Sequence, residues 1–333
     1  MTDEHHHQPG LSPIERRLIE RAADIMQDDP EQILFQHSML CQTYFPYRDP
    51  GAEVQEWLQT NGQVTLYMQA GVAIQPASEQ RAAQVIRCGL PFGAKSRLVL
   101  THLNSRALKN GSPQIDLEED TLTKFVRAMQ DPLKSKAVAP NGREIRAYKD
   151  QIMRLNTVNL QLATVLPDGK ARNSKPRIID QFDFTLTLTK NERQRVLWPE
   201  YIRLSPEYFE HLQRHAVPLD ERALAALAHN ALSIDIYCWL AQRLHRIPEG
   251  KDLFLSRSLL WRQFGQGYKR MDKFAAVFKD ALRQAASQYP RARLSLTTEG
   301  LTMWNSPPPI AGRLVAIGES GKSRSVVLQK PQS

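Results

Sequence analysis

The sequence lacks the cysteine pattern of a disulfide-bonded or metal-binding protein. Its 333 residues include three cysteines, Cys41, Cys88 and Cys238, which is an odd number spread far apart along the chain. This spacing gives neither a disulfide framework nor the close ligand pairs of a structural zinc site. No apolar run approaches the roughly 20 residues that a bilayer requires, and the N-terminus lacks the apolar core of a secretory signal. We therefore expect a cytoplasmic protein.

Basic residues are scarce in the first 90 residues of the chain. The whole sequence has 44 Lys and Arg against 35 Asp and Glu, a formal net charge of +9. Residues 1–90 carry 6 basic and 12 acidic side chains, so the remaining residues carry 38 and 23 and have a net charge of +15. Such segregation indicates an anionic partner, with nucleic acid first and a membrane surface second. The charge falls on predicted helix faces and hairpin tips and not on an amphipathic anchor, which favours nucleic acid.

No set of residues predicts catalysis. Ala316–Ser323 fits a relaxed phosphate-loop pattern, but only ten residues follow it, too few for the helix and magnesium-binding Asp of an NTPase. His211, Arg214 and Tyr237 are loosely similar to the residue order of tyrosine recombinases, yet Tyr237 lies in an apolar helix and is expected to be a core residue. The sequence also lacks the His-hydrophobe-His metal pair of rolling-circle nickases. We expect a protein that is not an enzyme and has no cofactor, no catalytic residues and no metal site, since the triple histidine His5–His7 lacks a packed surrounding.

Residues 1–88 are predicted to form an acidic, mixed helical extension, of which residues 1–11 are disordered. Ser12 and Pro13 are typical of a helix N-cap followed by its first position. Three further elements are expected before a loose connector over Gly71–Cys88: helices at Glu31–Gln42 and Val54–Leu58, and a strand at Gln63–Gln69.

Residues 89–200 have the element order of a winged helix, which is a helix-turn-helix with a β-hairpin appended. The expected elements are helices at Ala94–Lys109, Glu118–Met129 and Arg143–Leu155, a strand at Gln114–Leu117, and a hairpin of Thr157–Val165 with Arg177–Thr187. The loop of that hairpin contains the turn-forming Pro167-Asp168-Gly169.

Residues 201–305 repeat this order. The expected helices are Ser205–Arg214, Asp220–Ala228, Ala231–Arg246, Ser256–Phe264 and Met271–Gln288, and the expected strands are Tyr201–Leu204, Leu253–Leu255, Arg291–Leu296 and Leu301–Trp304. Residues 306–333 are expected to be a basic, flexible tail. The predicted fold class is therefore α+β: two tandem winged-helix domains with a mixed helical N-terminal extension and a flexible C-terminal tail.

Two predicted helices have a basic face opposite an apolar one. In Arg143–Leu155 the apolar face includes Tyr148 and Ile152 at helical spacing, and four basic residues fall mostly on the other side. These four are Arg143, Arg146, Lys149 and Arg154, and the loop that follows adds Lys170, Arg172, Lys175 and Arg177. A basic helix face suits the major groove, and a basic hairpin tip suits phosphates or the minor groove. A plain solvated face is the alternative for either helix alone.

The second such helix is Met271–Gln288, whose apolar stripe includes Phe274 and Phe278. Its candidate DNA-binding residues lie at its N-terminal end, on its exposed side and on the following hairpin: Lys269, Arg270, Lys273, Lys279, Arg283, Arg291 and Arg293. The N-terminal end of such a helix is the part that usually enters the groove. The repeated coincidence of helix face and hairpin predicts binding to double-stranded DNA.

Several long runs of the sequence resemble the RepA-type plasmid replication initiators. The runs are Gly89–Arg97, Trp198–Ser205, Arg214–Leu219, Ser233–Ala241, Phe264–Tyr268 and Ser306–Pro309. They lie within about residues 38–310, mostly in core helices and turns. The resemblance implies a protein built on two winged-helix domains that binds repeated sites at a plasmid origin, helps to open it and recruits the host helicase and polymerase. It also implies a homodimer when the protein represses its own gene and a monomer when it initiates.

The leading hypothesis is thus a plasmid replication initiator that binds repeated duplex DNA and contacts host replication proteins. A winged-helix transcriptional repressor without a replication role is the alternative, and a nicking or nucleotide-hydrolysing enzyme is a weaker third. Directly repeated sites beside an AT-rich stretch in the surrounding DNA would favour the initiator.

Overall fold

The computed structural model describes residues 11–75, 77, 82–116, 123–124, 126–127, 140–165, 171–174, 178–186, 197–310, 315–319 and 322–326. These residues form helices and small antiparallel sheets, which confirms the predicted α+β class. Across these ranges, no helix combines the length and the apolar character needed to cross a bilayer.

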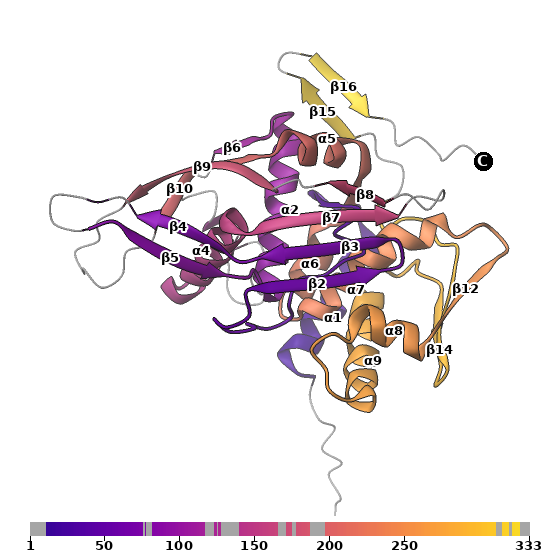
Figure 1. The fold of residues 1–333 in the computed structure, drawn as a ribbon. Coiled ribbons are helices and arrows are strands. Elements are labelled where there is room, and N and C mark those ends of the chain that lie inside the picture. The colour runs from indigo at the N-terminus through magenta and orange to yellow at the C-terminus, as the bar shows by residue number, and fades with distance from the viewer. Residues whose placement is uncertain are drawn as a thin grey trace, which may run out of the picture.

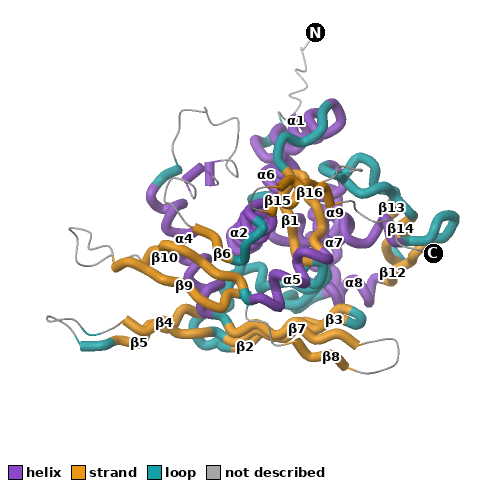
Figure 2. Tube along the Cα trace, turned by 90° about the horizontal axis from the view of Figure 1, so that it is seen from above, coloured by secondary structure: helices purple, strands orange, loops and turns teal. Residues whose placement is uncertain are grey.

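Two largely buried helices form the centre of the molecule. Helix α2 spans Gly93–Asn110 and α7 spans Ala231–Arg243, and 12 of the 13 residues of α7 are buried. A helix buried around its whole circumference has to be covered on every side. The two helices contact each other. Figure 2 shows them between a layer of strands and the helices α1 (Pro13–Gln27) and α6 (Glu221–Leu227).

A buried ion pair joins the two central helices. Arg97 of α2 donates from Nε and Nη2 to the two carboxylate oxygens of Asp235 on α7, both at 2.7 Å. The same guanidinium donates to the carbonyl oxygens of Phe45 at 2.7 Å and Gly93 at 2.8 Å. Burial lowers the pKa of Arg97, but the carboxylate raises it more, so the pKa ends above its ordinary value. One side chain therefore fixes the N-terminal segment, α2 and α7 relative to one another.

The N-terminal segment contains more strand than the sequence predicted. Helix α1 is confirmed, with a capping box in which Ser12 and Glu15 satisfy each other's backbone N–H groups. It is followed by five strands: β1 (Ile33–His37), β2 (Glu56–Asn61), β3 (Val64–Gln69), β4 (Gly71–Gln75) and β5 (Gln84–Gly89). The strand predicted at Gln63–Gln69 is confirmed as β3.

The predicted helices at Glu31–Gln42 and Val54–Leu58 are wrong, and the predicted connector over Gly71–Cys88 is the β4–β5 hairpin. Strand β1 pairs with β11 (Ala216–Asp220), and β2 pairs with β3. The β1–β11 ladder joins segments far apart in sequence, and long-range pairing of this kind overrides local propensity. The N-terminal segment also reaches the middle of the chain, because β3 pairs with β7 (Asn159–Val165).

In residues 89–204 two helices form where they were predicted, but the strands pair differently from the prediction. Its remaining elements are β6 (Gln114–Asp116), α4 (Gly142–Thr157), β8 (Ala171–Ser174), β9 (Ile179–Leu186) and β10 (Leu197–Leu204). Helices α2 and α4 confirm two predicted helices, while most of the helix predicted at Glu118–Met129 lies outside the described residues.

The predicted hairpin of Thr157–Val165 with Arg177–Thr187 is wrong. Strand β7 lies in a four-stranded sheet of order β2-β3-β7-β8, and β9 instead pairs with β10 in a sheet of order β6-β10-β9. The physical reason is burial: Leu160 and Leu162 of β7 lie opposite Met68 and Leu66 of β3, and all four side chains are buried. Figure 1 shows β2, β3 and β7 side by side across one face of the molecule.

The last third of the chain follows the predicted order closely. Its elements, besides β11, α6 and α7, are α5 (Pro206–His215), the short 3-10 helix η1 (Leu244–Arg246), β12 (Asp252–Ser256), α8 (Arg257–Phe264), α9 (Met271–Ser287), β13 (Leu294–Leu296) and β14 (Gly300–Trp304). The three strands form a sheet of order β12-β14-β13. Gly300 permits the close approach of β14 to β12, because a Cβ there would lie 2.1 Å from the Leu255 carbonyl oxygen.

The expectation of a flexible tail over residues 306–333 is wrong for part of it. Strands β15 (Val315–Glu319) and β16 (Lys322–Val326) pair as an antiparallel hairpin, which stands at the top of the molecule in Figure 1. The β-branched residues Val315, Ile317 and Val326 suit a pleated ladder. Of residues 1–11, predicted to be disordered, residues 1–10 lie outside the described ranges.

Removing one partner of the central ion pair is expected to destabilise the protein strongly. Asp235→Ala leaves the Arg97 guanidinium buried without its counter-charge, and we expect a loss of about 3–5 kcal/mol in the free energy of unfolding. Urea unfolding followed by circular dichroism measures this. Asp272→Ala, which breaks an exposed ion pair with Arg270 on α9, is the matched control and should change stability little. Equal midpoints for the two variants would contradict the central role of the pair.

Stability is also expected to fall below pH 6.5. The His37 ring is buried, with ring centroids 4.7 Å from Tyr208 and 4.4 Å from His211. Burial, with smaller contributions from His211 and His215, holds the pKa of His37 well below 6.5. Below pH 6.5 His37 binds a proton in the unfolded chain but stays neutral in the folded chain. The free energy of unfolding therefore decreases as the pH falls below 6.5.

His37→Phe keeps a ring in the stack and removes the proton-binding group. Between pH 6.5 and 5, the slope of unfolding free energy against pH should decrease by up to about 1.4 kcal/mol per pH unit. Urea titrations at several pH values measure the slope. An unchanged slope would show that His37 does not contribute.

Candidate nucleic-acid interface

Helix α4 presents part of the basic face predicted for it. The helix begins after Asn141, whose side chain accepts from the backbone N–H groups of Arg143 and Glu144. Tyr148 and Ile152 are buried on one side, while Arg143 and Arg146 are exposed. Arg146 Nε donates to the Gly142 carbonyl oxygen at 3.0 Å, so this side chain lies along its own helix. We call Arg143 and Arg146 the α4 face.

The other two basic residues predicted on this helix are less accessible. Lys149 is half-buried, and Arg154 is engaged within the protein. Arg154 Nε donates to Asp150 at 2.9 Å, its Nη1 donates to the Leu90 carbonyl oxygen at 3.1 Å, and its guanidinium lies 4.9 Å from the centre of the Phe92 ring. We leave Arg154 out of the candidate interface because these contacts would have to break before it could meet a phosphate.

Of the four cations in the predicted basic loop, only Arg172 lies in the described part of the chain. Lys170, Lys175 and Arg177 lie outside the described residues. Arg172 belongs to β8, an edge strand of the sheet that contains β2, β3 and β7, and not to the β9–β10 hairpin. The sequence between β9 and β10, residues 187–196, contains further basic residues that the prediction overlooked: Lys190, Arg193 and Arg195.

Helix α9 presents the more extensive basic face. Phe274, Phe278 and Leu282 are buried at helical spacing, which turns the opposite side of the helix to solvent. The predicted residues on that side and just before the helix are all exposed: Lys269, Arg270, Lys273, Lys279 and Arg283. We call these five residues the α9 face.

Two carboxylates partly neutralise the positive charge of the α9 face. Arg270 Nη2 lies 2.6 Å from Asp272, and Arg283 Nη2 lies 3.0 Å from Asp280. The hydrogen bond from Arg270 lowers the pKa of Asp272, so this carboxylate stays ionised. Both pairs are exposed, and exposed pairs exchange partners at little cost. Lys269, Lys273 and Lys279 form no ion pair with a carboxylate in the described part of the chain.

The hairpin after α9 carries the last two predicted residues at its entrance. Arg291 and Arg293 are exposed and precede β13, which begins at Leu294. The Arg293 backbone N–H donates to Ser306 Oγ at 2.9 Å, and this bond fixes the start of the strand. These residues therefore lie beside the hairpin and not at its tip.

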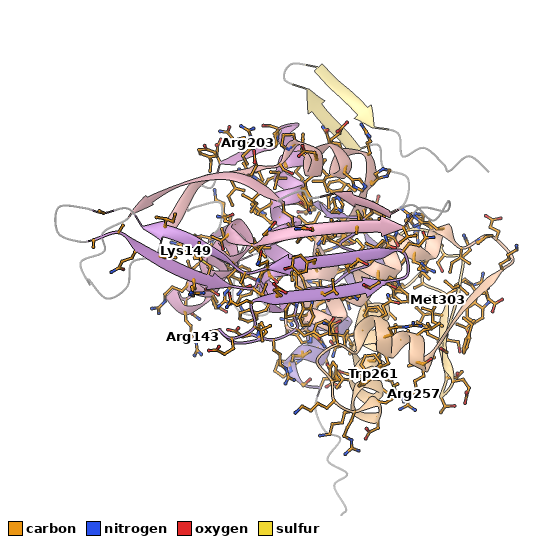
Figure 3. The ribbon with its side chains drawn as sticks, in the orientation of Figure 1. Arg143, Lys149, Arg203, Arg257, Trp261 and Met303 are labelled. Atoms are coloured by element: carbon orange, nitrogen blue, oxygen red, sulfur yellow. The ribbon has the colours of Figure 1, made fainter. Side chains whose placement is uncertain are left out.

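Arg257 is a basic residue at this end of the molecule that the sequence reasoning did not single out. It is exposed at the first position of α8, after the N-cap Ser256, and its Nη2 lies 3.5 Å from the Met271 carbonyl oxygen at the start of α9. The sequence did offer a signal for an exposed Arg257, because this residue directly follows Ser256, a typical helix N-cap. Figure 3 shows Arg257 and Trp261 of α8 on the opposite side of the view from Arg143 and Lys149 of α4.

Two motifs set aside on sequence grounds lie wholly or partly in the described part of the chain. Tyr237 is fully buried in α7, and its hydroxyl accepts from the Asp220 backbone N–H at 3.2 Å, as expected of a core residue. The phosphate-loop-like residues Ala316–Ser323 fall largely in the two antiparallel strands β15 and β16 and not in a strand followed by a helix. Within the described ranges, no group of three or more His, Cys, Asp or Glu side chains is arranged to hold a metal ion.

Comparison with known proteins identifies one family. The family model described as plasmid-encoded RepA protein matches residues 90–263, which is just over half of the chain. No curated protein matches the sequence.

Two solved structures of RctB are similar to this one at low sequence identity. The crystal structure of RctB domains 2–3 has 10% identity and a TM-score of 0.46, with 80% of this chain and 94% of that chain covered. A crystal structure of selenomethionine derivatives of domains 2 and 3 of RctB has 11% identity and a TM-score of 0.44, with 84% and 91% covered.

Proposed function

The chain belongs to the family of plasmid-encoded RepA proteins, and we propose that it initiates plasmid replication by binding repeated double-stranded DNA sites at an origin. Origin opening, recruitment of host replication proteins and repression of its own gene, as a homodimer, are parts of the same proposal. No step of it requires a catalytic residue or a cofactor.

The observation that carries the proposal is the α9 face. A helix whose aromatic side is buried, and whose other side and N-terminal flank together carry five exposed cations, can lie in the major groove, where arginine and lysine donate to guanine edges and phosphates. Arg257, at the start of α8, is within reach of the same end of the helix and is assigned here to a phosphate. Arg291 and Arg293 beside the hairpin are assigned to the backbone that flanks the groove.

We assign both later blocks, 89–200 and 201–305, to winged-helix domains. The strand order supports this assignment: the two sheets β6-β10-β9 and β12-β14-β13 each have their third strand between the first and the second. Strand β10 crosses the boundary at residue 200 and pairs with β6 through Tyr201–Arg203, so the sheet of the first block extends into the start of the second. In each block a helix precedes the first strand and a basic helix precedes the second. The first block differs by its β7–β8 insertion, which joins the sheet of the N-terminal segment.

A single lysine of the α9 face is expected to contribute measurably to DNA affinity. Lys273→Ala should weaken binding to duplex origin repeats by about 1–3 kcal/mol if the ammonium group contacts a base edge. Gel-shift titration with the repeat and with a scrambled duplex measures this. If Lys273 contacts only phosphate, both duplexes should be weakened alike and the salt dependence should become shallower.

Arg214→Ala is the matched control, because Arg214 is an exposed cation on α5, a helix that packs on α2, β1 and β11. Its affinity should equal that of the parent. Arg146→Ala tests the α4 face in the same titration and is expected to weaken binding by about 1–3 kcal/mol if Arg146 reads a base. Parental affinity in both interface variants would refute the assigned surfaces.

A replication assay separates an initiator from a repressor that uses the same surfaces. A plasmid that carries the origin but lacks its replication gene should be maintained when this protein is supplied in trans, and it should be lost with Lys273→Ala at low expression. Binding to the repeats without maintenance of the plasmid would favour the winged-helix repressor.

A further inference from the structure

A large cleft lies between the N-terminal sheet and the last third of the chain, on a surface that the proposed DNA contacts do not use. Its volume is about 1220 Å³. The turn between β2 and β3 forms one wall, and the end of α7, η1, β12 and α8 form the other. Pockets for small molecules usually measure about 300–1000 Å³, so the size of this cleft suits a segment of chain better than a compact ligand.

The charge of the cleft is positive and poorly compensated. Its lining includes four cationic side chains and one carboxylate: Arg243, Arg246, Lys251, Arg262 and Asp252. Arg243 is half-buried, and its Nε has no hydrogen-bond partner in the described part of the protein. Burial lowers the pKa of this guanidinium; Tyr44 acts in the opposite direction, and Arg246, three residues later, adds a smaller lowering. Placing like charges together at a partly buried site costs free energy, which an anionic occupant would offset.

The cleft also exposes aliphatic side chains. Leu58, Val165 and Leu259 all line it, and their exposed fractions are 59%, 46% and 38%. Its one aromatic lining residue, Trp239, is only 1% exposed and offers no ring face to a base. Single-stranded nucleic acid is usually bound through aromatic stacking platforms. Aliphatic and cationic walls without exposed rings therefore favour a peptide over a nucleic acid.

Two sheet edges contribute to the walls. Strand β2 ends the sheet of order β2-β3-β7-β8, and β12 ends the sheet of order β12-β14-β13. Residues of both strands line the cleft. The outward-facing Leu58 carbonyl oxygen of β2 already accepts from Gln266 Nε2 at 3.0 Å, so this position of the edge is occupied from within the chain. An extended segment can add to the remaining part of a sheet edge through its own backbone.

We propose that this cleft is a docking groove for an extended, acidic segment of a partner protein in which carboxylate and aliphatic side chains alternate. The carboxylates pair with Arg243 and Arg246 on one wall, and the aliphatic side chains pack on Leu58 and Val165 on the other. In an extended segment successive side chains point to opposite sides, so an alternating sequence presents charge to one wall and apolar surface to the other. The inference goes beyond DNA binding and concerns a separate surface.

The test uses the full chain and defined probes in fluorescence anisotropy titrations. The probes are a labelled octapeptide of alternating glutamate and leucine, its counterpart with glutamine in place of glutamate, and a labelled 12-nucleotide oligothymidylate. The parent should bind the acidic octapeptide more tightly than the glutamine peptide. Arg243→Gln with Arg246→Gln should weaken binding of the acidic peptide about tenfold or more, and should leave the glutamine peptide unaffected.

The matched control is Arg16→Gln with Arg214→Gln, which removes the same charge from exposed positions outside the cleft. This control should bind the acidic peptide like the parent. Urea unfolding midpoints establish that both double variants are folded, and Leu58→Ala, which leaves the charges in place, provides a second variant that should also weaken the acidic peptide.

Three results would overturn the proposal. These are no binding of the acidic peptide by the parent, equal weakening in the cleft and control variants, and loss of oligothymidylate binding in the cleft variant with peptide binding intact. The last result would identify a nucleic-acid groove instead. Because Lys273→Ala should leave peptide binding unchanged and the cleft variant should leave duplex binding unchanged, failure here is distinguishable from failure of the proposed function.

Discussion

The arrangement of this molecule depends on the buried pair of Arg97 and Asp235. Taking two charges out of water is costly, and the cost is offset only when the geometry is good and the remaining donors are satisfied. Here both bonds of the bidentate pair are 2.7 Å long, and backbone carbonyl oxygens accept from the remaining guanidinium donors. Because the acceptors come from α2, α7 and the N-terminal segment, the charge is satisfied only when all three are assembled.

The Arg97–Asp235 pair also determines the relative positions of the two basic helices, α4 and α9. Helix α4 packs on α2, and α9 packs on α7. Fixing α2 against α7 therefore fixes the α4 face relative to the α9 face. The proposed DNA contacts of the two blocks are thus connected through packed helices, and in this arrangement the packing sets the spacing of the sites they would contact.

The acidic N-terminal segment is part of the same assembly. Its strands pair with both later blocks, through β1 with β11 and through β3 with β7. One of its carboxylates, Asp49, lies 3.7 Å from Arg154, a cation that the sequence had assigned to DNA. The hairpin of β2 and β3 also forms a wall of the cationic cleft. The negative charge of this segment therefore acts inside the molecule as well as on its surface.

The sequence by itself determined most helices of the two later blocks and, for α4 and α9, which side is buried. The stripe of Phe274, Phe278 and Leu282 predicted α9 and its exposed cations, because helical periodicity is a property of neighbouring residues. Only the tertiary structure decided the partners. Strands β7 and β9 have similar patterns, and burial of Leu160 and Leu162 against β3 selected one pairing over the other. The tertiary structure also decided that Glu31–Gln42 is largely a strand and a turn, that Arg154 is engaged within the protein, and that a cleft lies beside the β2–β3 turn. These outcomes depend on strand pairing and on competition for charged groups. Both arise between residues that are distant in sequence and meet only in the folded chain.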